Sequence, residues 1–336
     1  MKILYLNYPL PSDGLEQATF GDAATLAMYP IDGKPTAQEM AEADGIITGS
    51  ANHDVGAVDQ YPNCKIILRL GVGYDNLDIA AWGARGVPVC NVPDYGTSEV
   101  ADHAVTLMVT LARGVVHYQE KLRADPAGNW GWAPGPRLMR RLRDNTFGII
   151  GFGRIGMAAA RRAAGFGMDI VFYDPHLPNG VELGFGCRRV HSVEELMAQS
   201  DAVSLHAPST PETKHIINAK SLAAAKQDLI LINTARGPLV DLDALHDALK
   251  SGKVGGAGLD VFPSEPPTPL PKLLAAWRDR EAWLADRLLV TPHAAFFSPP
   301  ANLDIRRKAA ECLLVYLRDG RLTNCVNLDL LRRNKP

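Results

Sequence analysis

Short apolar runs alternate with longer amphipathic stretches along most of the chain. In its first part, runs rich in Ile, Leu and Val occupy 2–8, 45–50, 65–71 and 87–93. Runs of this length and composition predict buried β-strands. The stretches between them are long enough to hold crossover helices, so we expect the strands to pair in parallel.

From Glu99 onward the spacing of apolar residues becomes helical. Apolar side chains recur at intervals of three and four, at Val100, Ala104, Leu107, Met108, Leu111 and Val115. One continuous apolar stripe predicts a single long helix. Because it lies between two series of strands, this helix is the expected bridge between two domains.

A second series of apolar runs follows, with strands expected at 147–151, 169–174, 201–208, 228–235, 256–262 and 288–293. Helical stretches separate most of them, which predicts a doubly wound parallel sheet. The proline-rich segment 263–271 is expected to form a loop before a helical insertion that contains Trp277. A last amphipathic helix is predicted over 301–320.

Composition places the chain among globular proteins of two domains. With 336 residues, 46% of them hydrophobic and 21% charged, the chain can bury a sizeable core in each domain. The formal net charge of −2 gives no field that would attract nucleic acid or a membrane surface. One basic cluster, residues 137–144, is interpreted as a solvated helix face or a subunit contact.

The cysteines argue for a reducing compartment. There are five, at Cys64, Cys90, Cys187, Cys312 and Cys325, with no C-x-x-C pair and no H-E-x-x-H motif. Scattered cysteines in odd number predict reduced thiols and no metal site. The apolar start of the chain is too short for a signal peptide, and no run approaches the ~20 apolar residues that span a bilayer. We therefore expect a soluble, cytoplasmic protein.

Three spaced glycines, Gly151, Gly153 and Gly156, follow the apolar run 147–150. In a G-x-G-x-x-G turn, the first glycine permits the tight turn, the second lets the backbone approach a pyrophosphate, and the third lets helix pack closely on strand. Asp174 ends the next predicted strand, where a carboxylate accepts the 2′-hydroxyl of a ribose. The alternative is a glycine turn with a chance acid, but strand, glycines, helix and acid together predict an NAD(H) site.

Four later strand ends carry polar residues: His206, Arg236, Asp260 with Glu265 close behind it, and His293. Ligands bind beyond the carboxyl ends of the strands in an open α/β sheet. Taken singly, such a histidine is more often structural and such an arginine more often a salt-bridge partner. Together they favour hydride transfer to a carbonyl, with His293 as acid and base, Glu265 orienting its ring, Arg236 binding and polarising the substrate, and Asp260 near the nicotinamide.

On these motifs the sequence resembles the NAD-dependent D-2-hydroxyacid dehydrogenase family, over essentially its whole length. The matching segments are RLGVGYDNLDIAAWGARGVPVCNVP (69–93), GIIGFGRIG (148–156), LINTARGPLVDLDAL (231–245), GAGLDVF (256–262) with SEP (264–266), and TPHAAFFS (291–298). Within the family, VCNVPDYGTSEVAD (89–102), TPHAAFFS and TNCVN (323–327) are most similar to the C-terminal-binding-protein branch and its bacterial enzyme relatives.

The resemblance implies an α/β protein with two Rossmann-like lobes. A doubly wound NAD-binding domain, 98–298, would be inserted into a flavodoxin-like substrate domain made of 1–97 and 299–336. The active site would lie in the cleft between the lobes, with helices 99–117 and 299–319 as the hinge. The segment 118–145, with Trp130 and Trp132, corresponds to the family's dimerisation region, so a homodimer is expected.

The resemblance also assigns residues. The catalytic set is Arg236, Glu265 and His293. The expected cofactor contacts are Val100, Gly151, Gly153, Arg154, Ile155, Gly156, Asp174, His206, Ala207, Pro208, Thr234, Ala235 and Asp260. The expected substrate contacts are Arg69, Val72, Gly73, Arg236, His293 and Phe296. Phe296 stands where the branch usually has Trp, which implies a roomier pocket. The stretch 266–287 is longer than the family minimum, and no role for it follows.

Three functions remain open at this point. The first is an NAD(H)-dependent enzyme that interconverts a 2-oxo acid and a D-2-hydroxy acid. The second is an NAD(H)-sensing scaffold or corepressor-like binding protein, which would need a peptide groove and disordered tails. The third is a relative that oxidises formate or phosphite, although formate dehydrogenases have Gln at the position of Glu265. The complete Arg–Glu–His set favours the first.

Overall fold

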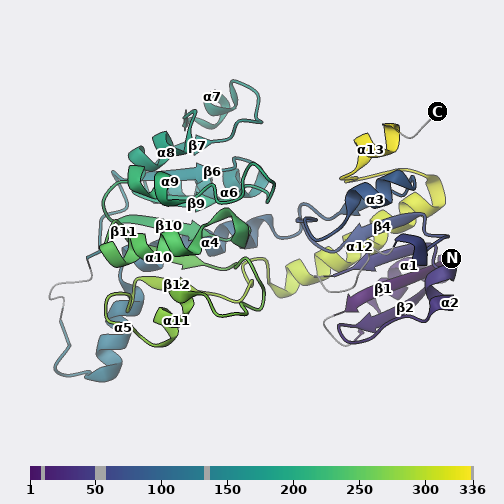
Figure 1. The fold of residues 1–336 in the computed structure, drawn as a ribbon, viewed down its shortest axis with the longest axis horizontal. Coiled ribbons are helices and arrows are strands. Elements are labelled where there is room, and N and C mark those ends of the chain that lie inside the picture. The colour runs from purple at the N-terminus through teal and green to yellow at the C-terminus, as the bar shows by residue number, and fades with distance from the viewer. Residues whose placement is uncertain (9–11, 50–57, 132–136, 334–336) are drawn as a thin grey trace. The chain divides into compact units, whose positions relative to one another are not determined.

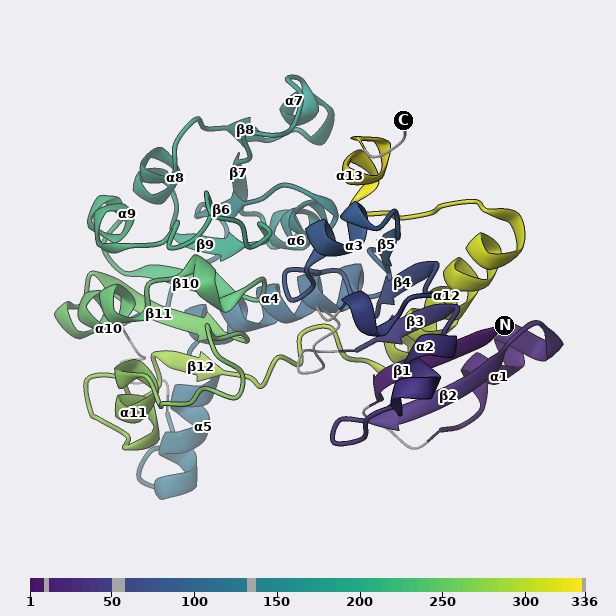
Figure 2. The same cartoon turned by 45° about the vertical axis from the view of Figure 1, so that its right-hand side comes forward.

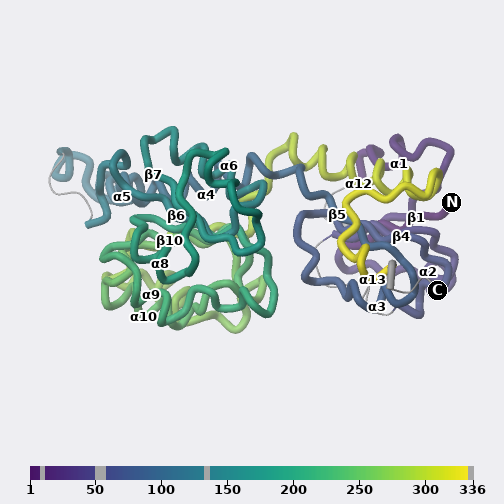
Figure 3. Tube along the Cα trace, turned by 90° about the horizontal axis from the view of Figure 1, so that it is seen from above, coloured from purple at the N-terminus to yellow at the C-terminus, as the bar shows by residue number. Residues whose placement is uncertain are grey.

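The computed structural model describes residues 1–8, 12–49, 58–131 and 137–333. The chain folds into two compact units. The terminal unit consists of Met1–Gly96 together with Phe297–Pro336, and the central unit of Thr97–Phe296. In Figure 3 the terminal unit contains both the purple start and the yellow end of the chain. The teal and green central unit comes between these two segments in the sequence.

The terminal unit contains one five-stranded sheet. Its strands are β1 (Lys2–Tyr8), β2 (Thr25–Pro30), β3 (Gly45–Thr48), β4 (Ile66–Arg69) and β5 (Val89–Asn91). They lie in the order β2-β1-β3-β4-β5, and every neighbouring pair is parallel. This is the strand order of a flavodoxin-like sheet.

Helices from both ends of the chain cover this sheet (Figure 2). They are α1 (Leu15–Phe20), α2 (Ala37–Glu42), α3 (Ile79–Ala84), α12 (Pro299–Asp319) and α13 (Leu328–Arg333), with short 3-10 turns η1 (Gly21–Ala23) and η2 (Val58–Gln60). On one face, Ile305 and Leu313 of α12 share a buried core with Ile3 and Tyr5 of β1. On the other face, Trp82 of α3 is fully buried.

An ion cluster joins α12 to the start of α1, with Arg306 and Glu16 buried and Asp13 exposed. Arg306, only 4% exposed, donates from Nε to Glu16 at 2.5 Å and from Nη1 to Asp13 at 2.9 Å. The guanidinium holds the pKa of Asp13 at about 2, well below its usual range, mainly through this hydrogen bond. Breaking one member of such a buried set leaves an uncompensated charge. The cluster therefore ties α12 to residues near the N-terminus.

The central unit contains one seven-stranded sheet (Figure 1). Its strands are β6 (Thr146–Ile150), β7 (Asp169–Tyr173), β8 (Arg188–Arg189), β9 (Ala202–Leu205), β10 (Leu229–Asn233), β11 (Val254–Leu259) and β12 (Leu288–Val290). The order is β12-β11-β10-β9-β6-β7-β8, with every pair parallel. The order reverses direction beside β6, which is the doubly wound pattern.

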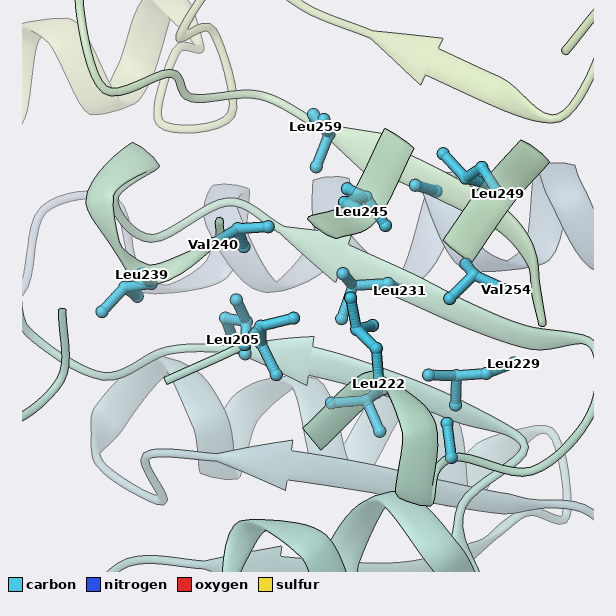
Figure 4. Packing of buried hydrophobic residues seen from close by; sticks show 14 of the residues in the cluster. Leu205, Leu222, Leu229, Leu231, Leu239, Val240, Leu245, Leu249, Val254 and Leu259 are labelled. Atoms are coloured by element: carbon cyan, nitrogen blue, oxygen red, sulfur yellow. The ribbon is translucent and has the colours of Figure 1, made fainter. Parts of the chain in front are cut away.

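Helices pack on both faces of the central sheet. The helices of this unit are α4 (Thr97–Ala112), α5 (Val115–Ala124), α6 (Arg154–Gly165), α7 (Val181–Phe185), α8 (Val193–Gln199), α9 (Ala219–Ala224), α10 (Leu242–Ser251) and α11 (Lys272–Arg278), with the 3-10 turn η3 (Gly237–Leu239). Among them α5 buries no residue. Successive residues of β10 alternate between the two cores. Leu229 and Leu231 face α9 and α10 (Figure 4), whereas Ile230 and Ile232 pack in the core that contains α4 and α6.

The two parallel sheets confirm the predicted α/β class with two Rossmann-like lobes. Most predicted strands are present, but β2 and β8 were not predicted. β2 contains the short apolar run 26–29, which was overlooked, and its residues are half-buried or exposed at the sheet edge. β8 consists of two arginines, so no apolar run marks it. Ser50, the last residue of one predicted strand, lies outside the described residues.

The single helix predicted over 99–117 is wrong. The helix ends at Ala112, and α5 begins separately at Val115. Gly114 has φ +61°, a left-handed conformation that ends a helix and that glycine adopts without strain. Val115 is consequently 55% exposed instead of extending the buried stripe.

Candidate active site

The predicted cofactor residues gather at the carboxyl ends of the central strands, with the glycine turn after β6. Gly151 has φ +88°, and a Cβ there would lie 2.6 Å from the amide nitrogen of Ala207. A Cβ on Gly156 would lie 2.2 Å from the carbonyl oxygen of Gly151. These two glycines let β6, β9 and α6 approach one another.

Gly153 has a different role, because a Cβ on it would meet no atom within 4 Å. It precedes α6, and no side chain caps the amides of that helix's first turn. Arg154 is exposed and Ile155 half-buried in this turn. Free amides at the start of a twelve-residue helix suit a phosphate group.

Asp174 follows β7 and is fixed by two backbone amides. Its Oδ2 accepts from the amide of Phe152 at 2.9 Å, and its Oδ1 accepts from that of His176 at 3.0 Å. The first bond connects the carboxylate directly to the glycine turn. Each oxygen keeps a further lone pair that could accept a ribose hydroxyl.

Two buried polar atoms near the ends of β9 and β10 test whether a cofactor fits. Nδ1 of His206 and the hydroxyl oxygen of Thr234 have no hydrogen-bond partner among the described residues. Nε2 of His206 is 2.9 Å from Ser204 Oγ, and burial lowers the pKa of His206 to about 4, so the ring is neutral at pH 7. Buried polar atoms without partners are uncommon in folded proteins. Their place beside the glycine turn fits a polar ligand such as NAD(H).

Three of the remaining predicted cofactor residues follow the same strands, and the fourth lies on α4. Ala207 is buried and Pro208 exposed after β9, Ala235 is half-buried after β10, and Val100 is 8% exposed on α4. They supply backbone and apolar surface rather than polar side-chain groups.

His293 and Glu265 form a direct pair. The Nδ1 of His293 lies 2.5 Å from Glu265 Oε2, while Glu265 Oε1 accepts from the amide of Phe262 at 2.9 Å. Burial by itself would raise the pKa of Glu265, but the hydrogen bonds from His293 and Phe262 and the charge of Arg236 bring it below its usual value. An anionic Glu265 therefore orients the imidazole and leaves Nε2 available.

Arg236 stands in a turn shaped by its neighbours. The side chain of Asn233 donates to the carbonyl of Arg236 at 2.8 Å and accepts from the amide of Ala235 at 3.0 Å. The next residue must be glycine, because a Cβ on Gly237 would lie 1.9 Å from the carbonyl carbon of Phe262. That close approach brings the turn carrying Arg236 to the loop carrying Glu265.

Asp260 organises the turn that carries His293. The amide of His293 donates to the carbonyl of Asp260 at 2.8 Å. The next two amides, of Ala294 and Ala295, donate to its carboxylate oxygens at 2.9 and 3.0 Å. His293 has φ +53°, a strained conformation for a residue with a Cβ, which these three bonds hold. Asp260 is only 1% exposed, so its carboxylate is committed to the turn.

Two residues missed at the sequence level complete this network. The hydroxyl of Thr291 donates to Asp260 Oδ1 at 2.5 Å, and Nε2 of His103 on α4 lies 3.0 Å from Thr291 Oγ1. Because a carboxylate can only accept, the threonine proton points to Asp260, and Nε2 of His103 must carry the proton shared with Thr291. Thr291 belongs to the quoted TPH motif, but no local signal connects His103 to it.

The predicted substrate residues divide between the two units. In the central unit, the rings of Phe296 and His293 meet edge-on, with centroids 6.1 Å apart. In the terminal unit, Arg69 ends β4 and donates from Nε to Asn76 Oδ1 at 3.3 Å. The loop with Val72 and Gly73 follows.

The loop after β4 is held by the end of β5. The side chain of Asn91 donates to the carbonyl of Val72 at 2.6 Å, and the amide of Val92 donates to the carbonyl of Gly71 at 3.1 Å. Asn91 is 6% exposed and was not predicted from the sequence. It fixes the backbone of the predicted carboxylate-binding loop.

In the described parts of the chain, no helix combines the length and the apolar character that crossing a bilayer requires.

Comparison with known proteins identifies one family. Residues 105–295 match the family model described as "D-isomer specific 2-hydroxyacid dehydrogenase, NAD binding domain". A glyoxylate reductase of Thermococcus litoralis is 36% identical over 305 residues, covering 89% of this chain and 88% of the relative.

Two solved structures are similar over almost their whole length. D-lactate dehydrogenase from Aquifex aeolicus, complexed with NAD and lactic acid, has a TM-score of 0.81 at 28% identity, covering 99% of this chain and 98% of that one. An NADPH-dependent glyoxylate/hydroxypyruvate reductase from Sinorhizobium meliloti, in complex with NADP and malonate, has a TM-score of 0.81 at 28% identity, covering 97% and 96%.

These matches support an enzyme that couples NAD(H) to the interconversion of 2-oxo and 2-hydroxy acids, and they do not favour the scaffold. On the family match and the extent of the similarity, the chain belongs to the D-isomer specific 2-hydroxyacid dehydrogenase family.

Proposed function

We propose that this protein reduces a small 2-oxo acid, with glyoxylate as the leading candidate, to the corresponding 2-hydroxy acid with NADH. The observation that carries the catalytic assignment is the 2.5 Å contact between His293 and Glu265. The substrate follows from similarity, because a relative covering most of the chain is a glyoxylate reductase.

NAD(H), when bound, supplies or accepts the hydride. His293 donates a proton to the carbonyl oxygen from Nε2, since its Nδ1 faces Glu265. The anionic carboxylate of Glu265 stabilises the positive charge of the ring before the proton leaves it. In the oxidative direction the same nitrogen takes the proton back.

Arg236 binds the substrate carboxylate and polarises the carbonyl, because its forked donors match a carboxylate. The backbone amides of Val72 and Gly73 are proposed to bind the same carboxylate. Arg69 is proposed as a second cation for substrates that carry a further acidic group. Phe296, packed edge-on to His293, limits the substrate side chain.

Asp174 is proposed to accept the adenosine ribose 2′-hydroxyl and to repel the 2′-phosphate of NADP(H). Its position beside the glycine turn, fixed by the amide of Phe152, supports this role. Gly153 and the first turn of α6 are proposed to receive the pyrophosphate, and His206 and Thr234 to line the site with their unpartnered buried atoms.

Three finer assignments complete the proposal. The chain is placed with the bacterial enzyme relatives of the C-terminal-binding-protein branch, which the segments 89–102 and 323–327 support. It is proposed to act in the cytoplasm, which five scattered cysteines support. It is proposed to form a homodimer through 118–145, where Trp130 is 79% exposed. Trp132 of this segment lies outside the described residues.

The test is NADH oxidation, followed by ultraviolet absorbance, against glyoxylate, pyruvate, hydroxypyruvate, phenylpyruvate, 2-oxoglutarate and 2-ketogluconate. The proposal expects the highest kcat/KM with glyoxylate or another short oxo acid, and a lower value with NADPH than with NADH. A clear preference for phenylpyruvate or 2-oxoglutarate would overturn the substrate assignment. Equal use of NADPH would overturn the role of Asp174.

A further inference from the structure

Three cysteines that are far apart in the sequence meet within the terminal unit. Cys90 lies on β5, Cys312 on α12, and Cys325 on the segment that returns from α12 toward α13 (Figure 2). All three belong to one core cluster of this unit, and Cys90 faces Cys325 across a β-bridge. No step of the proposed catalysis uses them. In the described chain, no three His, Cys, Asp or Glu side chains are placed to hold a metal ion, so the cluster calls for thiol chemistry instead.

Cys90 and Cys325 stand directly opposite each other in an antiparallel bridge. On one side of the pair the amide of Val326 donates to the carbonyl of Val89 at 2.8 Å. On the other side the amide of Asn91 donates to the carbonyl of Asn324 at 3.2 Å. This pattern defines a non-hydrogen-bonded pair, whose Cα atoms lie about 4.5 Å apart. A disulfide bridges Cα atoms roughly 4.4–6.8 Å apart, so the backbone can accept one without a large shift.

The three thiols share protons unequally. Cys90 donates to its neighbours, and these hydrogen bonds together with burial raise its pKa. The same bonds lower the pKa of Cys312 and that of Cys325 to about 7. By contrast, burial raises the pKa of Cys64, on the opposite face of the sheet, to about 12. Cys312 and Cys325 are therefore the more acidic thiols of the cluster, and the thiolate is the reactive form of cysteine.

Exposure favours Cys325 over Cys312 as the attacking thiol, and the sulfur of Cys325 donates to Asn327 Oδ1 at 3.3 Å. Cys325 is partly exposed, whereas Cys312 is buried and Cys90 has no exposed surface. The sulfur of Cys312 also lies 3.1 Å from the hydroxyl oxygen of Thr323. Solvent therefore reaches the cluster through Cys325.

We propose that Cys90 and Cys325 form a dithiol site that a hydroperoxide oxidises to a disulfide, and that this bond weakens binding of the oxo-acid substrate. The thiolate of Cys325 attacks a peroxide oxygen, the O–O bond breaks, and a sulfenic acid forms. The sulfur of Cys90 then attacks the sulfenic sulfur, the S–O bond breaks, and water leaves. For hydrogen peroxide the sum is two thiols oxidised, one peroxide reduced and two waters formed. A thiol reductant reverses it.

The link to the substrate runs through Asn91, the residue after Cys90. Its side chain holds the carbonyl of Val72, and its amide bonds the same segment that carries Cys325. A disulfide between Cys90 and Cys325 would lock the hydrogen bonds that Asn91 makes to both segments. The loop with Val72 and Gly73 would then adapt less well to a substrate carboxylate. This part of the inference rests on the proposed function, which assigns that loop to the substrate carboxylate.

The experiment treats the full-length protein with hydrogen peroxide and compares it with the fully reduced protein. Intact mass without reductant should fall by two hydrogen atoms, and peptide mapping should recover a Cys90–Cys325 cross-link. The oxidised enzyme should show a severalfold higher KM for glyoxylate with unchanged NADH affinity, and dithiothreitol should restore the original KM. Cys325→Ser and Cys325→Ala should abolish both effects, whereas Cys187→Ser, which removes a thiol of the central unit, should retain both.

The outcomes separate this inference from the proposed function. Absence of a disulfide, or a bridge from Cys90 to Cys312 instead, overturns the site whatever the enzyme's activity. A Cys90–Cys325 bridge that leaves the KM unchanged overturns the link to substrate. A protein that reduces no oxo acid but still forms the bridge contradicts the proposed function and leaves the dithiol site standing.

Discussion

At the scale of single residues, the chemistry depends on side chains that are held by others. His293 is oriented by Glu265 and carried on a turn that Asp260 fixes through three successive amides. A ring held in this way is aligned before substrate arrives, which is how positioned groups contribute to rate.

Replacement of His293 by Ala should reduce kcat by about 10²–10⁴-fold, the usual contribution of a general acid. NADH affinity, measured by fluorescence titration, should change little because the cofactor residues lie on other strand ends. His191→Ala, at an exposed histidine, serves as the control. Turnover that survives in His293→Ala would remove this residue from the mechanism.

Thr291 offers a test of the support behind the catalytic turn. Thr291→Val keeps the shape but removes the bonds to Asp260 and His103, so we expect a loss of about 1.5–3 kcal/mol in the free energy of unfolding. Misplacement of His293 should also lower kcat by up to about 10²-fold. Thr291→Ser keeps the hydroxyl and should restore most of both. Equal behaviour of the two variants would argue that the hydroxyl does not position the turn.

His206 should make stability depend on pH. Its pKa is about 4 in the folded protein and near 6.5 in the unfolded chain, so the unfolded state binds more protons between these values. Above pH 6.5 the histidine is neutral in both states and the free energy of unfolding is at its full value. As the pH falls from 6.5 toward 4, protonation of His206 in the unfolded chain lowers the free energy of unfolding by up to about 3 kcal/mol. The melting temperature should therefore fall more steeply with decreasing pH for the wild type than for His206→Gln, whose side chain cannot titrate. Parallel curves would contradict the prediction.

At the scale of elements, the contact between β6 and α6 determines the cofactor site. Gly156 lies where helix and turn are closest, whereas Gly165, at the other end of α6, has open space around it. Substitutions at Gly156 and Gly165 can therefore be compared as test and control on the same helix.

Gly156→Ala would place a methyl group 2.2 Å from the carbonyl oxygen of Gly151. We expect weaker NADH binding and a lower melting temperature, because α6 must shift away from the turn. Gly165→Ala meets no atom and should be neutral or stabilising by about 0.5–1 kcal/mol. Calorimetric titration with NADH compares them, and equal affinities would show that close packing here is not required.

The sequence was most informative where the chemistry is local. The glycine turn, the acid after β7 and the polar strand ends are short motifs, and periodicity was enough to place the strands beneath them. It was less informative where an element depends on distant partners. The edge strand β8, two arginines, lacks an apolar run, and one glycine, Gly114, divides a stripe that otherwise predicts one helix. The bond from His103 to Thr291 exists only because α4 packs on the central sheet.

At the scale of the whole molecule, the proposed homodimer can be tested through an exposed tryptophan. Trp130 is 79% exposed within the proposed dimerisation segment, and covering such a side chain favours association. Trp130→Glu should lower the mass measured by light scattering from dimer toward monomer. Trp277→Glu, at a 41% exposed tryptophan on α11, should leave the dimer intact. A wild-type monomer, or a Trp130→Glu dimer, would contradict the proposal.

The division of the terminal unit between both ends of the chain has a consequence for biosynthesis. β1 emerges from the ribosome before the central unit, yet Ile305 and Leu313, which cover it, and Arg306, which pairs with Glu16, emerge after that unit. The central unit needs nothing from either end for its own core, so it can fold while the first strands still wait for their covering helix. Newly made β1 to β5 would thus expose an apolar face throughout translation of the central unit. During this interval a chaperone that binds nascent chains would find the largest exposed apolar surface.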